Sequence, residues 1–255
     1  PLSRLRARLG WGRWLRVFLA GILPSVFFSF SEWSEVFSGS WLRSLAYVMF
    51  VLAMVWLAGQ GEREIWSWDA LIAFLTILGV VVVLCDQFRY VLDTPLSLSW
   101  SEGNRLWDYS VLFGHRLYDY PVDKSIPAYI DIGRQSLWGL PFLFMDPDIW
   151  TMRLWNALVW TVPYILLGLA ILKSGKGRWG SWLIFGGWAL IFLTRGPIYS
   201  PLVLAAVLVA LGRRQPLWLA AILVLVAGMY ARYTRYTWLF APAMWAAMIW
   251  MMQAL

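Results

Sequence analysis

The sequence is poor in the residue types on which many soluble enzymes rely. It contains one cysteine, one histidine and 14% charged residues, against about 25% charged residues in ordinary soluble domains. The single Cys85 excludes a disulfide within the chain, and its position inside an apolar run predicts inert packing. With His115 alone, a histidine-based metal cluster or a serine triad has little to build on, so we expect no metal and no cofactor.

Acidic residues are absent from the last part of the chain, because no Asp or Glu follows Asp148. Every later arginine and lysine therefore lacks an acidic partner downstream. The net charge of +7 would suggest nucleic acid in a soluble chain. In a membrane protein, however, Lys and Arg in short cytoplasmic loops set the orientation, so we expect no nucleic-acid partner.

Long apolar runs are the main feature of the sequence, because hydrophobic residues make up 61% of the chain. A transmembrane helix needs about 20 apolar residues, and on that measure the runs predict about eight spans. Three spans, at residues 14–31, 41–59 and 70–90, precede a long polar segment. Five more follow it, at residues 152–172, 181–194, 201–212, 216–230 and 237–255.

These spans predict an all-α, polytopic transmembrane helix bundle that forms a single membrane domain over 1–255. Three N-terminal spans occupy 1–92, and an extracytoplasmic loop with an amphipathic helix occupies 93–150. About five further spans, some of them short, occupy 151–255. Membrane lipids are then obligatory partners.

The distribution of basic residues predicts the orientation of the bundle. The stretch Arg4–Arg16 places the N-terminus in the cytoplasm, and alternation places Lys173–Arg178 and Arg213–Arg214 inside as well. The polar segment 93–135 then lies outside, in a multi-pass protein of the plasma membrane. The chain begins at Pro1 without an initiator Met and ends within an apolar run, so we expect either end to be processed or incomplete.

Three of the later spans, of 14, 12 and 15 residues, are too short to cross about 30 Å of hydrocarbon as complete helices. Gly196-Pro197 and Pro201 also interrupt this region. Such interruptions are tolerated where protein or a water-filled cavity surrounds the freed backbone, which predicts a recess open to the outer face. A re-entrant hairpin or a locally thin bilayer is the alternative.

The outer segment carries two carboxylates that could act chemically. At about 100° per residue, the sequence from Arg105 to Tyr118 gives an amphipathic helix with Asp108 on its polar side. Glu102 lies just before it, where partial desolvation raises a carboxyl pKa toward that of a useful general base. The alternatives are a carboxylate that favours the helix N-terminus for Glu102, and pairing with Arg105 or solvation for Asp108.

Four arginines of the second half are candidate phosphate ligands. Arg195, Arg232 and Arg235 are predicted on the outer side, against the orienting trend, and Arg153 opens a span. Guanidinium groups suit bidentate phosphate recognition, so these residues could hold the phosphate of a lipid-linked substrate. Arginines at a membrane boundary also snorkel to lipid phosphates, and Arg153 could instead cap the outer end of its span.

The order of these motifs resembles the GT-C superfamily of membrane glycosyltransferases, which use polyprenyl- or dolichyl-phosphate sugars. The similarity covers residues 93–172. Its motifs are an acidic motif, a small-residue-Tyr turn, a Pro-containing stretch and a span opening with Arg, here Trp100-Ser101-Glu102-Gly103-Asn104, Phe113-Gly114-His115-Arg116-Leu117-Tyr118, Gly139-Leu140-Pro141 and Arg153-Leu154-Trp155-Asn156.

The resemblance implies an inverting transfer of a sugar from a polyprenyl-phosphate donor to an acceptor hydroxyl at the outer face. Glu102 would be the base, with Asp108 as a second candidate catalytic residue, and the outer arginines would bind the donor phosphate. Two alternatives stay open. One is a non-catalytic membrane subunit of a larger complex, such as a shortened or degenerate relative. The other is a transporter of lipid-linked substrate, which would not need Glu102 as a base.

Overall fold

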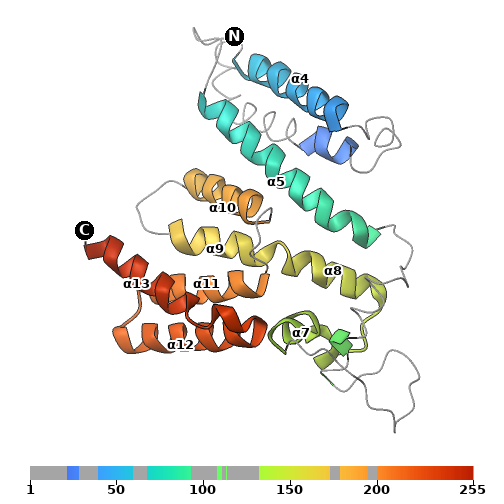
Figure 1. The fold of residues 1–255 in the computed structure, drawn as a ribbon. Coiled ribbons are helices and arrows are strands. Elements are labelled where there is room, and N and C mark those ends of the chain that lie inside the picture. The colour runs from blue at the N-terminus through green and yellow to red at the C-terminus, as the bar shows by residue number, and fades with distance from the viewer. Residues whose placement is uncertain are drawn as a thin grey trace. The chain divides into compact units, whose positions relative to one another are not determined.

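The computed structural model describes residues 22–28, 40–59, 68–92, 108–110, 113, 132–172, 179–194 and 200–254. All regular structure in these residues is helical (Figure 1), which confirms the predicted all-α class. The chain divides into two compact units, Pro1–Arg89 and Tyr90–Leu255. Each unit is described by itself.

Three stretches of the described residues are long and apolar enough to cross a membrane. They are Phe74–Val91, Ile149–Ile171 and Leu217–Thr234, of 18, 23 and 18 residues, which fits the range of about 17–25 residues for a transmembrane helix. These stretches are compatible with a membrane protein. The larger number of about eight spans stays a prediction.

The first unit contains α4 (Ser40–Gly59) and α5 (Trp68–Leu92), which continues three residues past the boundary between the units. Both helices begin and end within two residues of the predicted spans 41–59 and 70–90, because long apolar runs without Pro or Gly clusters leave few other choices. Cys85 is buried in α5, as its position inside an apolar run predicted.

The second unit begins with a short helix, α7, and a 3-10 turn, η1, which precede the long helices. Its elements are α7 (Ile132–Trp138), η1 (Leu140–Leu143), α8 (Ile149–Val159), α9 (Val162–Leu172), α10 (Trp179–Leu193), α11 (Ser200–Gly212), α12 (Leu217–Thr234), η2 (Tyr236–Trp238) and α13 (Ala241–Ala254).

Helix α11 occupies the centre of this unit, because it packs against α9, α12, α13 and α7. Leu202, Val203 and Ala205 are fully buried, and the helix is apolar all round, as buried helices are. At 13 residues it is as short as its apolar run predicted. Protein surrounds it, which is the condition under which a helix this short is tolerated at membrane depth.

The predicted span 152–172 is one apolar run but two helices, α8 and α9, separated at Trp160–Thr161. Pro163 lacks the N–H that would continue the helical hydrogen bonds, and its ring crowds the preceding turn. The hydroxyl of Thr161 donates to the carbonyl oxygen of Ala157 at 2.8 Å. The Thr161 hydroxyl therefore has a hydrogen-bond acceptor at the break, although its surroundings are apolar.

The lengths of two later spans differ from the prediction. Helix α12 reaches Thr234 and has 18 residues, so it is long enough to cross a membrane and the expected end at Tyr230 was wrong. Helix α13 has 14 residues, because the 3-10 turn η2 takes up the beginning of the predicted span 237–255. Pro242 favours a helix start at this point, since proline suits the first helical turn.

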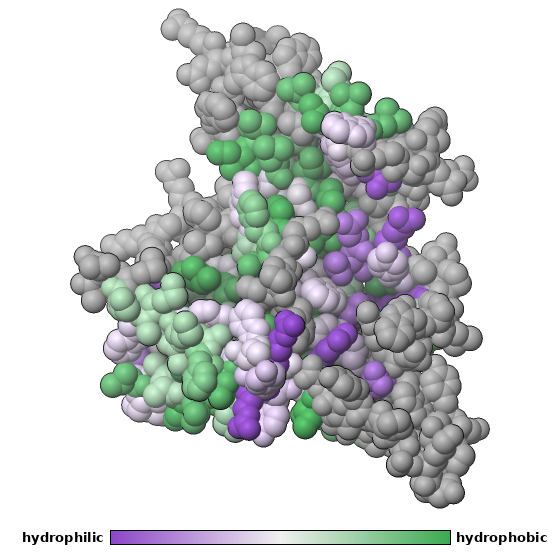
Figure 2. Space-filling view, in the orientation of Figure 1, coloured by the Kyte–Doolittle hydropathy of each residue, from purple (hydrophilic) through white to green (hydrophobic). Residues whose placement is uncertain are grey.

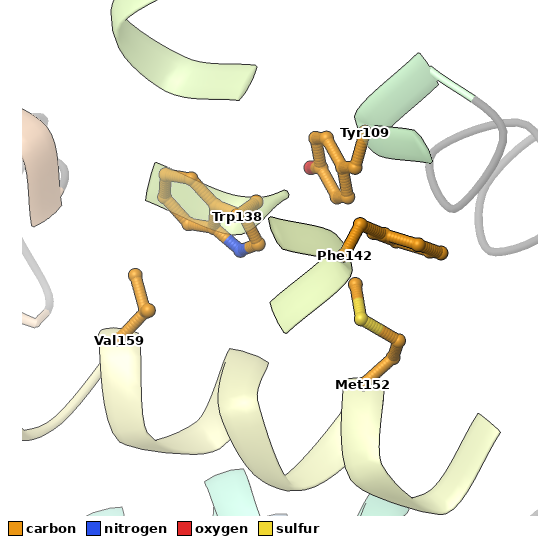
Figure 3. Close-up of a cluster of buried hydrophobic side chains, with 5 residues drawn as sticks. All are labelled: Tyr109, Trp138, Phe142, Met152 and Val159. Carbon is orange, nitrogen blue, oxygen red and sulfur yellow. The ribbon is translucent and has the colours of Figure 1, made fainter. Parts of the chain in front are cut away.

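An aromatic cluster joins α7, η1 and α8 (Figure 3). Its buried members are Tyr109, Trp138, Phe142, Met152 and Val159. The indole N–H of Trp138 donates to the side-chain oxygen of Asn156 at 2.7 Å. The indole N–H of Trp155 donates to the carbonyl oxygen of Leu137 at 2.9 Å. With both donors satisfied, large aromatic groups can be buried without an unpaired polar atom.

Helix α7 lies so close to the C-terminal end of α12 that only glycine fits at position 133. A Cβ atom there would lie 2.7 Å from the backbone nitrogen of Thr234 and 2.8 Å from the carbonyl carbon of Tyr233, and would also overlap the Thr234 hydroxyl. Backbone atoms cannot rotate away as side chains can. The contact therefore fixes α7 against α12.

We expect Gly133→Ala to destabilise the second unit, because the added methyl group must push α7 away from α12. Overpacking of this kind costs about 1–3 kcal/mol. Gly186→Ala is the matched control, since a Cβ atom there meets only the Leu169 side chain, at 3.7 Å. Thermal unfolding in detergent should show a lower midpoint for Gly133→Ala only; equal midpoints would contradict this account of the contact.

Candidate functional site

Helix α7 packs against both α8 and α12, and charged side chains lie on or next to these three helices. We call this region the polar end and define it by Asp108, Arg134, Asp148, Arg232 and Arg235. Figure 2 shows hydrophilic side chains over α7 and the C-terminal end of α12, beside the hydrophobic surface of α12 and α13. The polar end is thus continuous with an apolar surface, as expected at a membrane boundary.

Arg134 is the central cation of this region. Its guanidinium donates a hydrogen bond to the Tyr109 hydroxyl at 3.3 Å and lies over the Trp138 ring, 5.6 Å from the ring centroid. Arg134 and Trp138 are four residues apart on α7, the spacing that brings two side chains onto one helix face. The Tyr109 and Trp138 rings are stacked with their centroids 6.1 Å apart, so the two side chains that contact Arg134 also contact each other.

Two carboxyl groups of the polar end have opposite electrostatic environments. Burial raises the pKa of Asp108 above its ordinary value of 3.8, although the charge of Arg134 acts in the opposite direction. Hydrogen bonds from Thr151 hold the pKa of Asp148 below 3.8, and its backbone N–H donates to Asp148 at 2.7 Å. Asp148 therefore serves as the N-cap of α8, whereas Asp108 has the pKa direction required of a general base.

Arg232 and Arg235 lie at the end of α12, on either side of the buried Thr234. Both are exposed, and neither forms an ion pair with an acidic side chain of the described residues. Because Gly133 touches the backbone at Thr234, the chain segments that carry Arg134, Arg232 and Arg235 are in contact. The result is a concentration of positive charge suited to a phosphate.

The structure describes Asp108, Arg153, Arg232 and Arg235 of the predicted site, and their assignment to one site stays a prediction. Asp108 lies in a helical turn at 108–110, and Arg232 and Arg235 lie at the end of α12; all three belong to the polar end. Arg153 is half-buried in the second turn of α8. Glu102 and Arg195 lie outside the described residues, as does most of the predicted amphipathic helix.

Sequence reasoning missed Arg134, Tyr109 and the whole of α7. The segment 93–150 was predicted as a loop whose amphipathic helix ends at Tyr118, so a helix beginning at Ile132 was not expected. The spacing of Arg134 and Trp138 was the available signal, because an arginine four residues before a tryptophan can cover the indole face only in a helix. The apolar residues from Leu137 onward would have extended that pattern.

Comparison with protein-family models, curated proteins and solved structures finds no match to this chain. The chemistry of the polar end therefore has to be argued from its own residues. It combines a carboxyl group of raised pKa, a cation in contact with the same turn, and two exposed arginines. Such a set can hold an anionic group and accept a proton beside it.

The opposite pKa shifts of Asp108 and Asp148 predict opposite effects of pH on stability. Between 3.8 and the raised pKa of Asp108, the folded state binds more protons than the unfolded state, so stability falls as pH rises. Asp108→Asn should therefore unfold at a higher temperature than the wild type at pH 7, and this advantage should shrink toward about pH 3.

Asp148→Asn is the matched comparison. The lowered pKa of Asp148 gives stability that is present above 3.8 and lost as pH falls through the lowered value. This variant should unfold at a lower temperature at pH 7, with a difference that disappears in acid. Thermal unfolding from about pH 3 to pH 7 measures both; the same sign for the two variants would show that the assigned environments are wrong.

Proposed function

We propose that this chain is a multi-pass membrane glycosyltransferase of the plasma membrane. It transfers a sugar from a polyprenyl-phosphate donor to an acceptor hydroxyl at the outer face, with inversion at the sugar carbon. The observation that carries the proposal is the convergence at the polar end. The carboxyl-bearing turn at Asp108 and the arginines of α12 are far apart in sequence, and α7 connects them.

The proposed reaction needs one base and one phosphate site. The base takes the proton of the acceptor hydroxyl while the oxygen attacks the sugar carbon, and the bond from that carbon to the donor oxygen breaks with its electrons remaining on the phosphate. We assign the base to Glu102, with Asp108 as the second carboxylate on the same segment. Arg232 and Arg235 stabilise the phosphate as it leaves, together with Arg195 and Arg153.

The arrangement of basic residues in the second unit supports an outward-facing polar end. Helices α11 and α12 are joined by the short turn at Arg213–Arg214, at the opposite end of α12 from Thr234. In membrane proteins, Lys and Arg are enriched in short loops on the cytoplasmic side. With Arg213–Arg214 inside, the other end of α12 and the α7 that packs on it face outward, where a lipid-linked sugar would be used.

We expect Glu102→Gln to abolish sugar transfer, because glutamine keeps the shape of the side chain but cannot accept the proton. General-base catalysis contributes about 10²–10⁴-fold to such rates. The measurement is transfer of labelled sugar from a polyprenyl-phosphate donor in proteoliposomes, with the unfolding temperature as the folding control. Full activity of the variant would overturn the assigned base.

Arg232→Gln tests the phosphate site, and Arg213→Gln is its matched control at the other end of the same helix. Loss of one charge-assisted hydrogen bond costs about 1.5–3 kcal/mol, so KM for the donor should rise roughly tenfold or more in Arg232→Gln. Arg213→Gln should leave KM unchanged. Equal effects of the two substitutions would mean that net charge alone attracts the donor, and would contradict a phosphate site at Arg232.

A further inference from the structure

The turn between η1 and α8 exposes a cluster of large apolar side chains. Leu143, Phe144 and Met145 are 57%, 74% and 54% exposed, and we call these three residues the apolar tip. Ile149 and Trp150, at the start of α8, are also exposed, at 38% and 52%. Exposed apolar patches of this kind mark contacts with another protein or with a membrane.

The apolar tip belongs to a well-ordered turn. The backbone N–H groups of Phe144 and Met145 both donate to the carbonyl oxygen of Pro141, at 3.1 Å. On one side of the tip, Phe142 is buried in the aromatic cluster (Figure 3). On the other side, Pro147 is buried. The exposed side chains therefore project from a turn that is fixed at both ends.

The position of the tip in the chain identifies what it contacts. The 23-residue stretch Ile149–Ile171 is long and apolar enough to cross a membrane, and it begins four residues after Met145. Four residues span at most about 14 Å, so the tip lies close to the point where this stretch would enter the bilayer. Trp150, exposed at the same point, is of the residue type enriched at membrane–water interfaces.

The charges beside the tip limit how deeply it can enter the bilayer. Asp146 and Asp148 are exposed, and hydrogen bonds from Thr151 hold the pKa of Asp148 below its ordinary value. An ionised carboxylate is costly to move into hydrocarbon, so these residues stay on the water side. No Lys or Arg occurs between residues 143 and 150 to attract anionic lipids. Binding of the tip to a bilayer therefore depends on its apolar side chains.

A protein partner is the alternative occupant, but the tip is too small for one. Large apolar side chains have about 150–250 Å² of surface each, so the exposed part of these three amounts to roughly 300–450 Å². A stable protein interface removes about 800 Å² from each partner. A bilayer sets no such minimum, because its lipids surround whichever apolar groups enter it.

We propose that the apolar tip inserts into the interfacial layer of the bilayer and anchors the junction of η1 and α8 at the membrane surface. The depth is about 5–10 Å, as for other interfacial segments. The contact is with hydrocarbon and not with a particular head group. Insertion requires that Ile149–Ile171 crosses a membrane, and it is independent of sugar transfer. Because η1 follows α7 directly, the anchored tip keeps α7 close to the membrane surface.

Electron paramagnetic resonance of the full chain in phosphatidylcholine vesicles tests the insertion. Cys85→Ala removes the native thiol, and Met145→Cys then carries a nitroxide label at the tip. Oxygen, which concentrates in lipid, should relax this label more than a nickel chelate confined to water, at a depth of about 5–10 Å. Gln215→Cys is the control, because Gln215 is exposed in the polar turn between α11 and α12. The nickel chelate should relax the label there more strongly.

A second substitution separates insertion from mere proximity to the bilayer. Phe144→Asp places a charge on the tip, which hydrocarbon disfavours, and should move the Met145→Cys label into water. Phe144→Leu is the matched control and should leave the depth unchanged, because leucine is also apolar. Since Phe144 is exposed, both variants should unfold at the temperature of the labelled parent.

Stronger relaxation of the Met145→Cys label by nickel than by oxygen would overturn the proposal. A label that neither reagent reaches would also overturn it, because the tip would then be covered by protein. Unchanged depth in Phe144→Asp would show that the apolar side chains do not hold the tip in the bilayer. Greater depth in vesicles that contain phosphatidylglycerol would assign the contact to basic residues elsewhere. Glu102→Gln should not alter the depth, so the insertion and the assigned base can fail independently.

Discussion

The contact of Gly133 with the backbone at Tyr233–Thr234 determines the geometry of the polar end, because it sets the distance between α7 and α12. Arg134 follows Gly133 directly, and Arg232 and Arg235 flank Thr234. One close backbone approach therefore places three cations on adjoining segments. The Tyr109 hydroxyl bond and the Trp138 ring then fix the direction of Arg134. A side chain at position 133 would separate these groups by moving a whole helix.

Hydropathy was sufficient to predict most helices but not where every one of them ends. The bounds of α4, α5 and α11 follow from apolar runs that are bordered by polar or turn-forming residues. The break at Trp160–Thr161 lies inside an apolar run, and Pro163 was its only signal. Likewise α12 continues through Arg232, because Thr234 packs against α7 and its hydroxyl donates to the Tyr230 carbonyl oxygen. These ends depend on local hydrogen bonds and tertiary contacts to which average hydropathy is insensitive.

The sequence was enough to predict which kinds of residue the candidate site contains, but only some of the particular residues. Arginines with no acidic residue downstream and carboxylates before α7 were visible in the sequence, so Asp108, Arg232 and Arg235 were named. Arg134 was missed because its importance comes from a contact with Tyr109, 25 residues earlier. Spacing rules connect residues within one helix; they do not connect a turn at 108–110 with a helix that begins at Ile132.

Asp108 and Arg134 influence each other through charge. Burial raises the pKa of Asp108, and the positive charge of Arg134 limits that rise. An anion held at the polar end would offset part of this positive charge and raise the pKa of Asp108 further, because like charges disfavour the ionised form. A bound phosphate would thus make the carboxylate a stronger proton acceptor. Binding of an anion beside Arg134 and proton acceptance by Asp108 would therefore be linked by the same electrostatics.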